Sequence, residues 1–336
     1  MTDRWLRAAP PLAAAVYPGL VWLGPAVWRP LLAVTLVVPA IAVWASVRLA
    51  GGEARAARAV ALAAVGAPAL FSLLGGLLDF QRAIPLTSVT AWIPLWLVLA
   101  AIAWREPRTV TSSGSPARVA TEPAPTPRAG ASADLQSALV RPKPPRPSRL
   151  AIAHGIVALP IVAFALAHLV NHLSGAAGGA THLAVMSALR RVYRHPYVEP
   201  VLLACIGLQV ISGLVLVGRR LARRAAPIET LQSAAGAYLA LFFASHLTAV
   251  LRARGRGVET DWHWLTGSDL FRDPWSARLV PYYVLAVIAI ASHLACAVRA
   301  VAIGHGARRD GWSWLLAAAA GIGAAASAVI IAALAG

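Results

Sequence analysis

Long uninterrupted apolar runs are the feature of this sequence that most restricts its fold. Several of them, such as residues 151–173 and 313–335, exceed the ~18 apolar residues that mark a membrane-spanning helix. Charged residues make up only 13% of the chain, against roughly 25% in soluble domains. Because a helix satisfies its own backbone hydrogen bonds in lipid, the sequence predicts an all-α integral membrane protein.

The apolar runs also predict how the chain is organised. We expect about nine transmembrane helices, at residues 10–28, 31–48, 59–79, 88–104, 151–173, 197–218, 230–251, 280–303 and 313–335. Residues 106–149 contain nine prolines and little aromatic content, which is typical of an unfolded linker. The predicted organisation is therefore a four-helix region (1–105) of no assigned role, a Pro-rich linker (106–149) and a five-helix region (150–336).

The strong positive charge has a membrane explanation. The chain carries 30 Lys+Arg against 13 Asp+Glu, a net charge of +17, which in a soluble protein would suggest a nucleic-acid partner. Here the arginines cluster at the ends of apolar runs and in the linker, which favours lipid head-group contact and orientation instead. With the N-terminus and linker in the cytoplasm, 20 of the 30 lie on that side. We therefore expect a multi-pass protein of the inner (cytoplasmic) membrane with its C-terminus outside.

The histidines place the chemistry in the second half of the chain. All nine lie from His154 onward. Cys205 and Cys296 form no CxxC pair, which excludes a disulfide framework, a Cys-based zinc site and c-type haem attachment. His168, His246 and His293 each lie within a different expected span. One such histidine would more simply make an interhelical hydrogen bond, but three on separate helices favour a cofactor held within the bundle.

Depth in the membrane pairs these residues. At about 1.5 Å per residue, His168 and His246 both lie roughly 24–25 Å from the inner ends of their spans. His293 lies roughly 15 Å from its inner end, level with Gln209. Two neutral imidazoles at one depth suit the axial ligation of a b-type haem. Zinc would need three or four close ligands, and no Glu-x-x-His pair indicates a di-metal site.

Residues 150–303 resemble the five-helix cytochrome b membrane anchor of di-haem succinate dehydrogenases and fumarate reductases. The matching segments, in order, are ALAHLVNHLSG, VEPVLL with LQVISGL, ETLQSAAGAYLALFFASH and SHLACAV. The resemblance implies an outer haem between His168 and His246, and it matches His293 to one ligand of an inner haem. The other inner position is Gln209, and glutamine is a poor haem ligand. We therefore expect one haem b, and a second only if another ligand or five-coordinate iron replaces the lost bond.

The family also implies a function and partners. Its anchors carry electrons between membrane quinone and an iron–sulfur and flavoprotein pair on the cytoplasmic side. This chain has neither the cysteine clusters of iron–sulfur sites nor a GxGxxG fingerprint, so such activities would belong to separate subunits. At most, the chain would be the anchor subunit of an enzyme. The four extra N-terminal helices depart from the family, and a stand-alone haem protein stays open.

Further residues complete the predicted site. His172 lies one turn beyond His168 and could replace it as a ligand. Arg190, Arg191 and Arg252 lie near the outer ends of spans, where they would either pair with haem propionates or simply contact lipid and water. His154 and His305 favour an interfacial structural role. The aromatic cluster TDWHWL, which contains His263, favours an interfacial belt over a lid on a quinone or haem site.

A haem-free transporter or membrane scaffold is the competing hypothesis. In that case the histidines would only bridge helices. The number of spans and the histidine-free first half favour it, whereas the absence of a convincing repeat between the halves speaks against a transporter. Asp79 is the one candidate for proton coupling.

Overall fold

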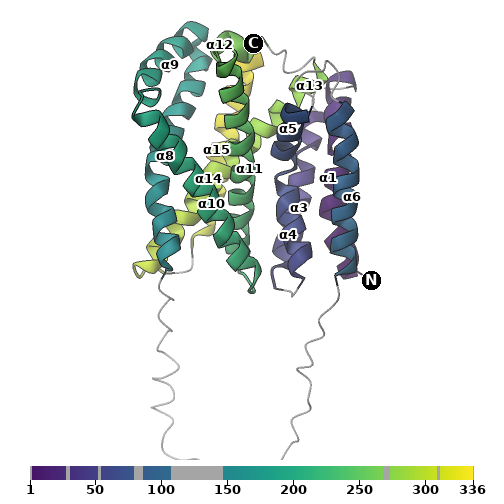
Figure 1. Ribbon diagram of the computed structural model, residues 1–336. Coiled ribbons are helices and arrows are strands. Elements are labelled where there is room, and N and C mark those ends of the chain that lie inside the picture. Colours follow the sequence, from purple (N-terminus) through teal and green to yellow (C-terminus); the bar gives the residue numbers. More distant parts are fainter. Residues whose placement is uncertain are drawn as a thin grey trace, which may run out of the picture.

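The computed structural model describes residues 2–27, 31–51, 54–78, 86–106, 147–267, 273–308 and 311–335. Every regular element in this part of the chain is a helix, so the predicted fold class is confirmed at that level. Two groups of helices stand side by side with their long axes roughly parallel (Figure 1). Asp79 and nearly all of the expected linker lie outside the described residues.

The first group contains the helices before the linker. They are α1 (Thr2–Val27), α2 (Leu31–Val34), α3 (Val37–Leu49), α4 (Arg55–Val65), α5 (Ala67–Leu78) and α6 (Leu86–Arg105). Its core is aromatic: Tyr17, Phe71, Trp92 and Trp96 are fully buried against one another. The Trp92 indole, which needs a hydrogen-bond partner when buried, donates to the carbonyl of Ala14 at 2.6 Å.

The second group contains the helices after the linker. They are α8 (Arg149–Ser174), η1 (Gly175–Ala177), α9 (Gly179–Tyr193), α10 (Val198–Leu221), α11 (Pro227–Gly255), α12 (Trp262–Thr266), α13 (Pro274–Ala277), α14 (Leu279–Gly304) and α15 (Ser313–Ala335). Local sequence sets where they begin. Ser148 caps α8 by accepting from the Ala151 amide at 3.2 Å. Pro227 opens α11, where Glu229 accepts from the Ala226 amide at 3.1 Å.

Five helices are long and apolar enough to cross a membrane, and all five lie in the second group. They cover residues 149–177, 198–221, 227–255, 275–304 and 313–335. Their outward faces carry exposed apolar side chains, including Ile156 and Leu159 on α8 and Ile211 on α10, as expected for contact with lipid. The protein is therefore a multi-pass membrane protein with five candidate crossings among the described residues.

The expected N-terminal spans differ from the observed helices. The expected span 59–79 is divided into α4 and α5, which form a pair bent by 69° that counts as at most one further crossing. The expected span 31–48 is interrupted at Thr35 and Leu36, between α2 and α3. In contrast, α1 continues unbroken through Pro18. Helix length and apolarity thus support five or six crossings in the described residues, and the expected nine are not confirmed.

The two groups share one core. Buried residues of the first group pack in a single cluster with Tyr238 and Phe242 of α11 and with Tyr282 of α14. Helix α11 contacts α3, α4 and α5, while α13 contacts α1. Arg58 of α4 donates to the carbonyl oxygens of Leu221 and Arg223, at 3.3 and 2.9 Å, at and just beyond the end of α10. The expected division at the linker therefore separates segments that pack as one body.

A hollow lies inside the second group. Helix α8 packs against α10, and α11 packs against α14, whereas close backbone contacts between α8 and either α11 or α14 are nearly absent among the described residues. The two helix pairs enclose two adjoining cavities that share the side chains of Ile161, Ala165, Phe243 and Ile290. With the molecule oriented as in Figure 1, α1 and α8 begin at the lower end and α15 finishes at the upper end.

Candidate functional site

The upper cavity contains a group of four histidines. It has a volume of about 210 Å³ and is lined by His168 and His172 of α8, His182 of α9 and His246 of α11. Its other walls are mainly apolar, with Phe164, Leu202 and Ile206 among them. The cavity therefore combines an apolar interior with several nitrogen donors.

His168 and His246 lie close together in this cavity, in agreement with the common depth that the sequence predicts for them. Their ring centroids lie 6.2 Å apart, with 65° between the ring planes. Phe164 stacks on His168 at 5.5 Å and Phe242 on His246 at 5.3 Å, which fixes the two ring orientations. Two imidazoles that bind one metal ion from opposite sides, each about 2 Å from it, have centroids roughly 6 Å apart. The observed separation therefore fits a bis-histidine pair.

A row of polar groups continues from His168 toward the upper end. The Nε2 atoms of His172 and His168 are 3.2 Å apart, and the His172 and His182 ring centroids are 5.5 Å apart. The Asn171 amide donates to Nε2 of His182 at 3.1 Å. Among the described residues, buried Nδ1 atoms of His172 and His182 and Oδ1 of Asn171 have no hydrogen-bond partner.

His182 lies at the closed end of this row. Its side chain is fully buried, and Trp262 of α12 covers it with ring centroids 4.9 Å apart. Burial, followed by the nearby positive charge of Arg190, lowers the pKa of the His182 imidazole, and Asp261 opposes this shift. In the TDWHWL cluster, Thr260, Trp264 and Leu265 also line the upper cavity. Part of the cluster therefore lies against the cavity, whereas His263 itself is exposed.

Arginines surround the upper end of the cavity. Of the three arginines predicted beside haem propionates, Arg190 lines the cavity and donates to Glu259 at 2.8 Å. Arg191 is exposed, and Arg252 donates to the carbonyl of Gly76 at 3.0 Å, in the first helix group.

The sequence reasoning missed Arg194 and Arg254, which line the cavity beside Arg190. Arg194 lies 3.8 Å from Glu259, and Arg254 forms an ion pair with Glu199. Helical spacing could have identified Arg194, because residues four apart share a helix face and adjacent residues do not.

The lower cavity has a volume of about 160 Å³ and contains Gln209 and His293, the pair that the sequence placed at one level. It also contains His154, for which a structural role at the interface was expected. The Gln209 amide donates to Nε2 of His154 at 2.9 Å, and Nδ1 of His154 lies 2.8 Å from the Ser212 hydroxyl. His154 precedes His168 by about four helical turns and therefore lies on the same face of α8. This spacing could have identified His154 from the sequence.

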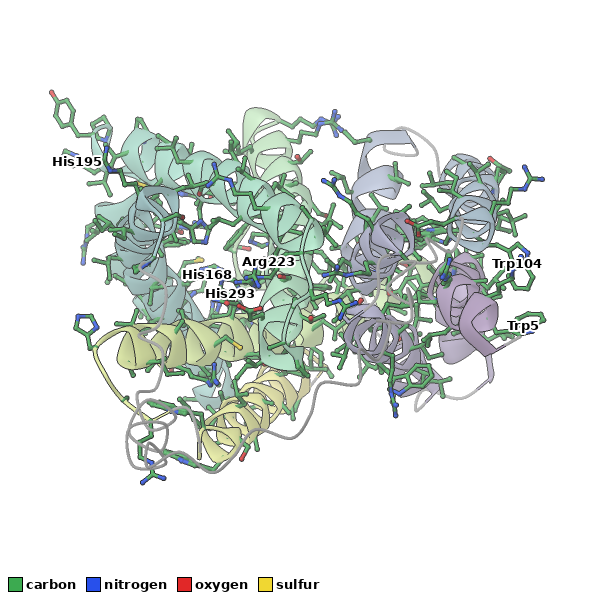
Figure 2. The ribbon with its side chains drawn as sticks, turned by 90° about the horizontal axis from the view of Figure 1, so that it is seen from below. Trp5, Trp104, His168, His195, Arg223 and His293 are labelled. Atoms are coloured by element: carbon green, nitrogen blue, oxygen red, sulfur yellow. The ribbon has the colours of Figure 1, made fainter. Side chains whose placement is uncertain are left out.

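Three further histidines are absent from the lining of both cavities. His195 is exposed and lies at the edge of the bundle, whereas His168 and His293 lie within it (Figure 2). His263 is exposed. His305 is also exposed, and its Nδ1 lies 2.9 Å from the carbonyl oxygen of Val301.

The donor set fits a haem better than a bare metal ion. In the part of the chain that the structure describes, no group of three or more His, Cys, Asp or Glu side chains is arranged to hold a metal ion. A structural zinc site would need four such ligands and a catalytic site three. A haem iron needs only two axial protein ligands, because the porphyrin supplies the other four donors.

Comparisons with known proteins provide no relative for this chain. No protein-family model, curated protein or solved structure matches it.

Proposed function

We propose that this protein is a membrane haem b protein, with His168 and His246 as the axial ligands of a haem in the upper cavity. The closeness of these two imidazoles in an apolar cavity, between α8 and α11 whose backbones make almost no close contact, carries the proposal. Bis-histidine haem supplies one-electron chemistry in the membrane. His172 is within reach of the same cavity and is the alternative ligand on α8.

The side chains around the proposed ligands have defined roles. Phe164 and Phe242 hold the ligand rings in orientation by stacking. The apolar walls exclude water. Burial of this kind and the axial ligands together set the reduction potential of a haem. Arg190, Arg194 and Arg254 provide positive charge at the upper end, where arginine forks suit carboxylates such as haem propionates. Their present partners Glu259 and Glu199 show that this rim already binds carboxylates.

We further propose electron transfer between membrane quinone and a redox partner as the role of this haem. The resemblance to succinate dehydrogenase and fumarate reductase anchors supports iron–sulfur and flavoprotein subunits as that partner. The proposal includes nine crossings in an inner membrane, with the N-terminus cytoplasmic. In support, the start of α1, the end of α6 and the start of α8 lie at one end of the molecule, and the end of α15 lies at the other (Figure 1).

Ligand substitutions test the proposed pair. His168→Ala and His246→Ala should each lower bound haem by about one equivalent per chain relative to the wild type, because each removes an axial bond. The variants His172→Ala and Gln209→Ala should retain the haem of the upper cavity. His305→Ala is the matched control at an exposed position. Haem is measured as the pyridine haemochrome of detergent-purified protein.

Two results would contradict the assignment. Unchanged haem content in both the His168 and His246 variants would exclude this ligand pair. Loss of haem in the His172 variant alone would show that the ligand on α8 is His172, one turn beyond His168. A well-folded protein with no haem would favour the alternative of a transporter or scaffold. In that case, the 3.2 Å contact between His168 and His172 would be a structural bridge.

A further inference from the structure

The lower cavity has its own pair of histidines from opposite walls. His154 belongs to α8, in one helix pair, and His293 belongs to α14, in the other. The cavity is separate from the upper histidine group but adjoins it through shared apolar side chains. The earlier pairing of His293 with Gln209 left only one good haem ligand at this level, whereas His154 supplies a second.

The hydrogen bonds of both rings prepare Nε2 for ligation. Nδ1 of His293 lies 3.1 Å from the Gln232 carbonyl oxygen, which can only accept, so Nδ1 carries the proton. His154 accepts at Nε2 from the Gln209 amide, so its Nδ1 donates to Ser212. Metal-bound histidines characteristically donate their other ring N–H in this way, which fixes the tautomer and the ring orientation. Both rings thus present a lone pair on Nε2.

Glycines hold the two rings against the helix backbones. A Cβ at Gly213 of α10 would lie 3.3 Å from Cε1 of His154, and one at Gly236 of α11 would lie 3.1 Å from Cε1 of His293. Both separations are tighter than ordinary side-chain contacts. Any larger residue would push the ring into the cavity, so these positions set how far each imidazole extends.

Two polar side chains of the cavity, Gln209 and Arg220, bear on what it could hold. Oε1 of Gln209 is buried and has no hydrogen-bond partner among the described residues. Arg220 donates to the Glu229 carbonyl at 2.7 Å, to Ser233 at 2.9 Å and to the Gln232 side chain at 3.3 Å, but to no carboxylate in this part of the structure. Arg220 therefore places a guanidinium at the wall of the cavity, a group that suits carboxylates such as a propionate.

We propose that the lower cavity is a second haem-binding site, with His154 and His293 as its axial ligands and Arg220 as a propionate partner. Gln209 then acts as a positioning residue that holds His154 until the iron bond replaces its amide. The inference rests on the proposed function in one respect, namely that the protein acquires haem. It assigns the second site to a ligand pair that joins α8 to α14.

Haem stoichiometry tests this site separately from the upper one. The wild type should contain two haems per chain, and His154→Ala and His293→Ala should each leave one or convert one to the high-spin form. His168→Ala should leave the lower haem, and the double variant H154A/H168A should lose both low-spin signals in the electron paramagnetic resonance spectrum. His305→Ala should match the wild type.

A rescue experiment separates ligation from folding. His154→Gly should lose one low-spin signal and regain it when imidazole is added, because imidazole can replace the missing axial bond. One haem per chain in the wild type, lost in the His168 variant and unaffected by His154→Ala, would overturn the lower site and leave the proposed function intact. No haem in any variant would overturn both.

Discussion

At the residue scale, neighbouring histidines have different environments. His168 and His246 are held by aromatic stacking and face a cavity. His182 is fully buried beneath Trp262 and accepts a hydrogen bond at Nε2. A buried imidazole of this kind is costly to protonate, since the charged form loses its hydration. His182 should therefore be neutral in the folded protein near pH 7.

The lowered pKa of His182 predicts how folding stability depends on pH. The folded protein binds a proton at His182 less readily than the unfolded chain does. The contribution of His182 to folding stability is therefore complete above the pKa of the unfolded chain, near 6.5, and it falls as the pH drops below that value. His182→Asn should flatten the fall of the thermal midpoint between about pH 6.5 and 5. The measurement is thermal unfolding in detergent over that pH range.

The exposed His195 provides the control for this prediction. His195→Asn should leave the pH dependence unchanged, since this side chain is exposed. A decrease in stability with pH that is identical in the wild type and the His182 variant would show that His182 does not contribute. Some dependence should persist in the variant, because other histidines of the cavity are also enclosed.

Individual residues show where sequence reasoning succeeds and where it stops. The common depth of His168 and His246 follows from the fixed rise of a helix, and the structure brings the two rings together. The direction of a side chain around its helix is harder to infer. Arg191 is exposed while Arg194 lines the cavity, because charge and depth alone do not specify a helix face.

At the element scale, the start of α4 depends on a residue distant in sequence. The Glu106 carboxylate accepts hydrogen bonds from the amides of Ala56 and Ala57, each at 2.8 Å. These amides belong to the first turn of the helix, whose N–H groups have no acceptor within the helix. A carboxylate there also interacts favourably with the helix dipole. Glu106 therefore caps α4 in the absence of a suitable local residue, since Ala54 precedes the helix.

Substitution of Glu106 should destabilise this helix end. Glu106→Ala should lower the free energy of unfolding by about 1 kcal/mol, as expected for loss of an N-cap. Glu106→Gln should have a smaller effect, because one acceptor oxygen is retained. Unfolding by denaturant gives the free energies, and hydrogen exchange at the Ala56 and Ala57 amides reports the cap directly. Unchanged exchange in Glu106→Ala would contradict the capping role.

The same element shows why hydropathy overestimates continuous spans. Residues 59–79 form one apolar run, but α4 and α5 meet at an angle of 69° beside Gly66. A Cβ at Gly66 would lie 2.2 Å from the Leu241 side chain of α11, so the bend is coupled to close packing with a distant helix. Hydropathy measures the transfer of side chains into lipid and contains no information about such tertiary contacts.

At the scale of the whole molecule, the two helix groups are held together by a shared core. Phe71 of α5 contacts Trp275 with ring centroids 5.8 Å apart, and a Cβ at Gly75 would overlap the same indole. Arg58 adds hydrogen bonds to the end of α10. The sequence predicts a division at the Pro-rich segment from composition alone, but such local information cannot show that distant helices pack together.

Cutting the chain between the groups tests this arrangement. A protease site inserted between residues 129 and 130 should allow cleavage without separation, because the buried aromatic interface does not depend on chain continuity. The two fragments should elute together in size-exclusion chromatography in detergent. Arg58→Met combined with Gly75→Leu should weaken the association after cleavage. Separation of the wild-type fragments would contradict the shared core.

The most direct test of the central claim is the haem content of the purified wild-type protein, together with its reduced-minus-oxidised spectrum. The protein should be produced in haem-replete cells and shown to be monodisperse. We predict a low-spin b-type spectrum and two haems per chain; one haem would retain the His168–His246 site and remove the lower one. Monodisperse, stably folded protein without haem would contradict the assignment.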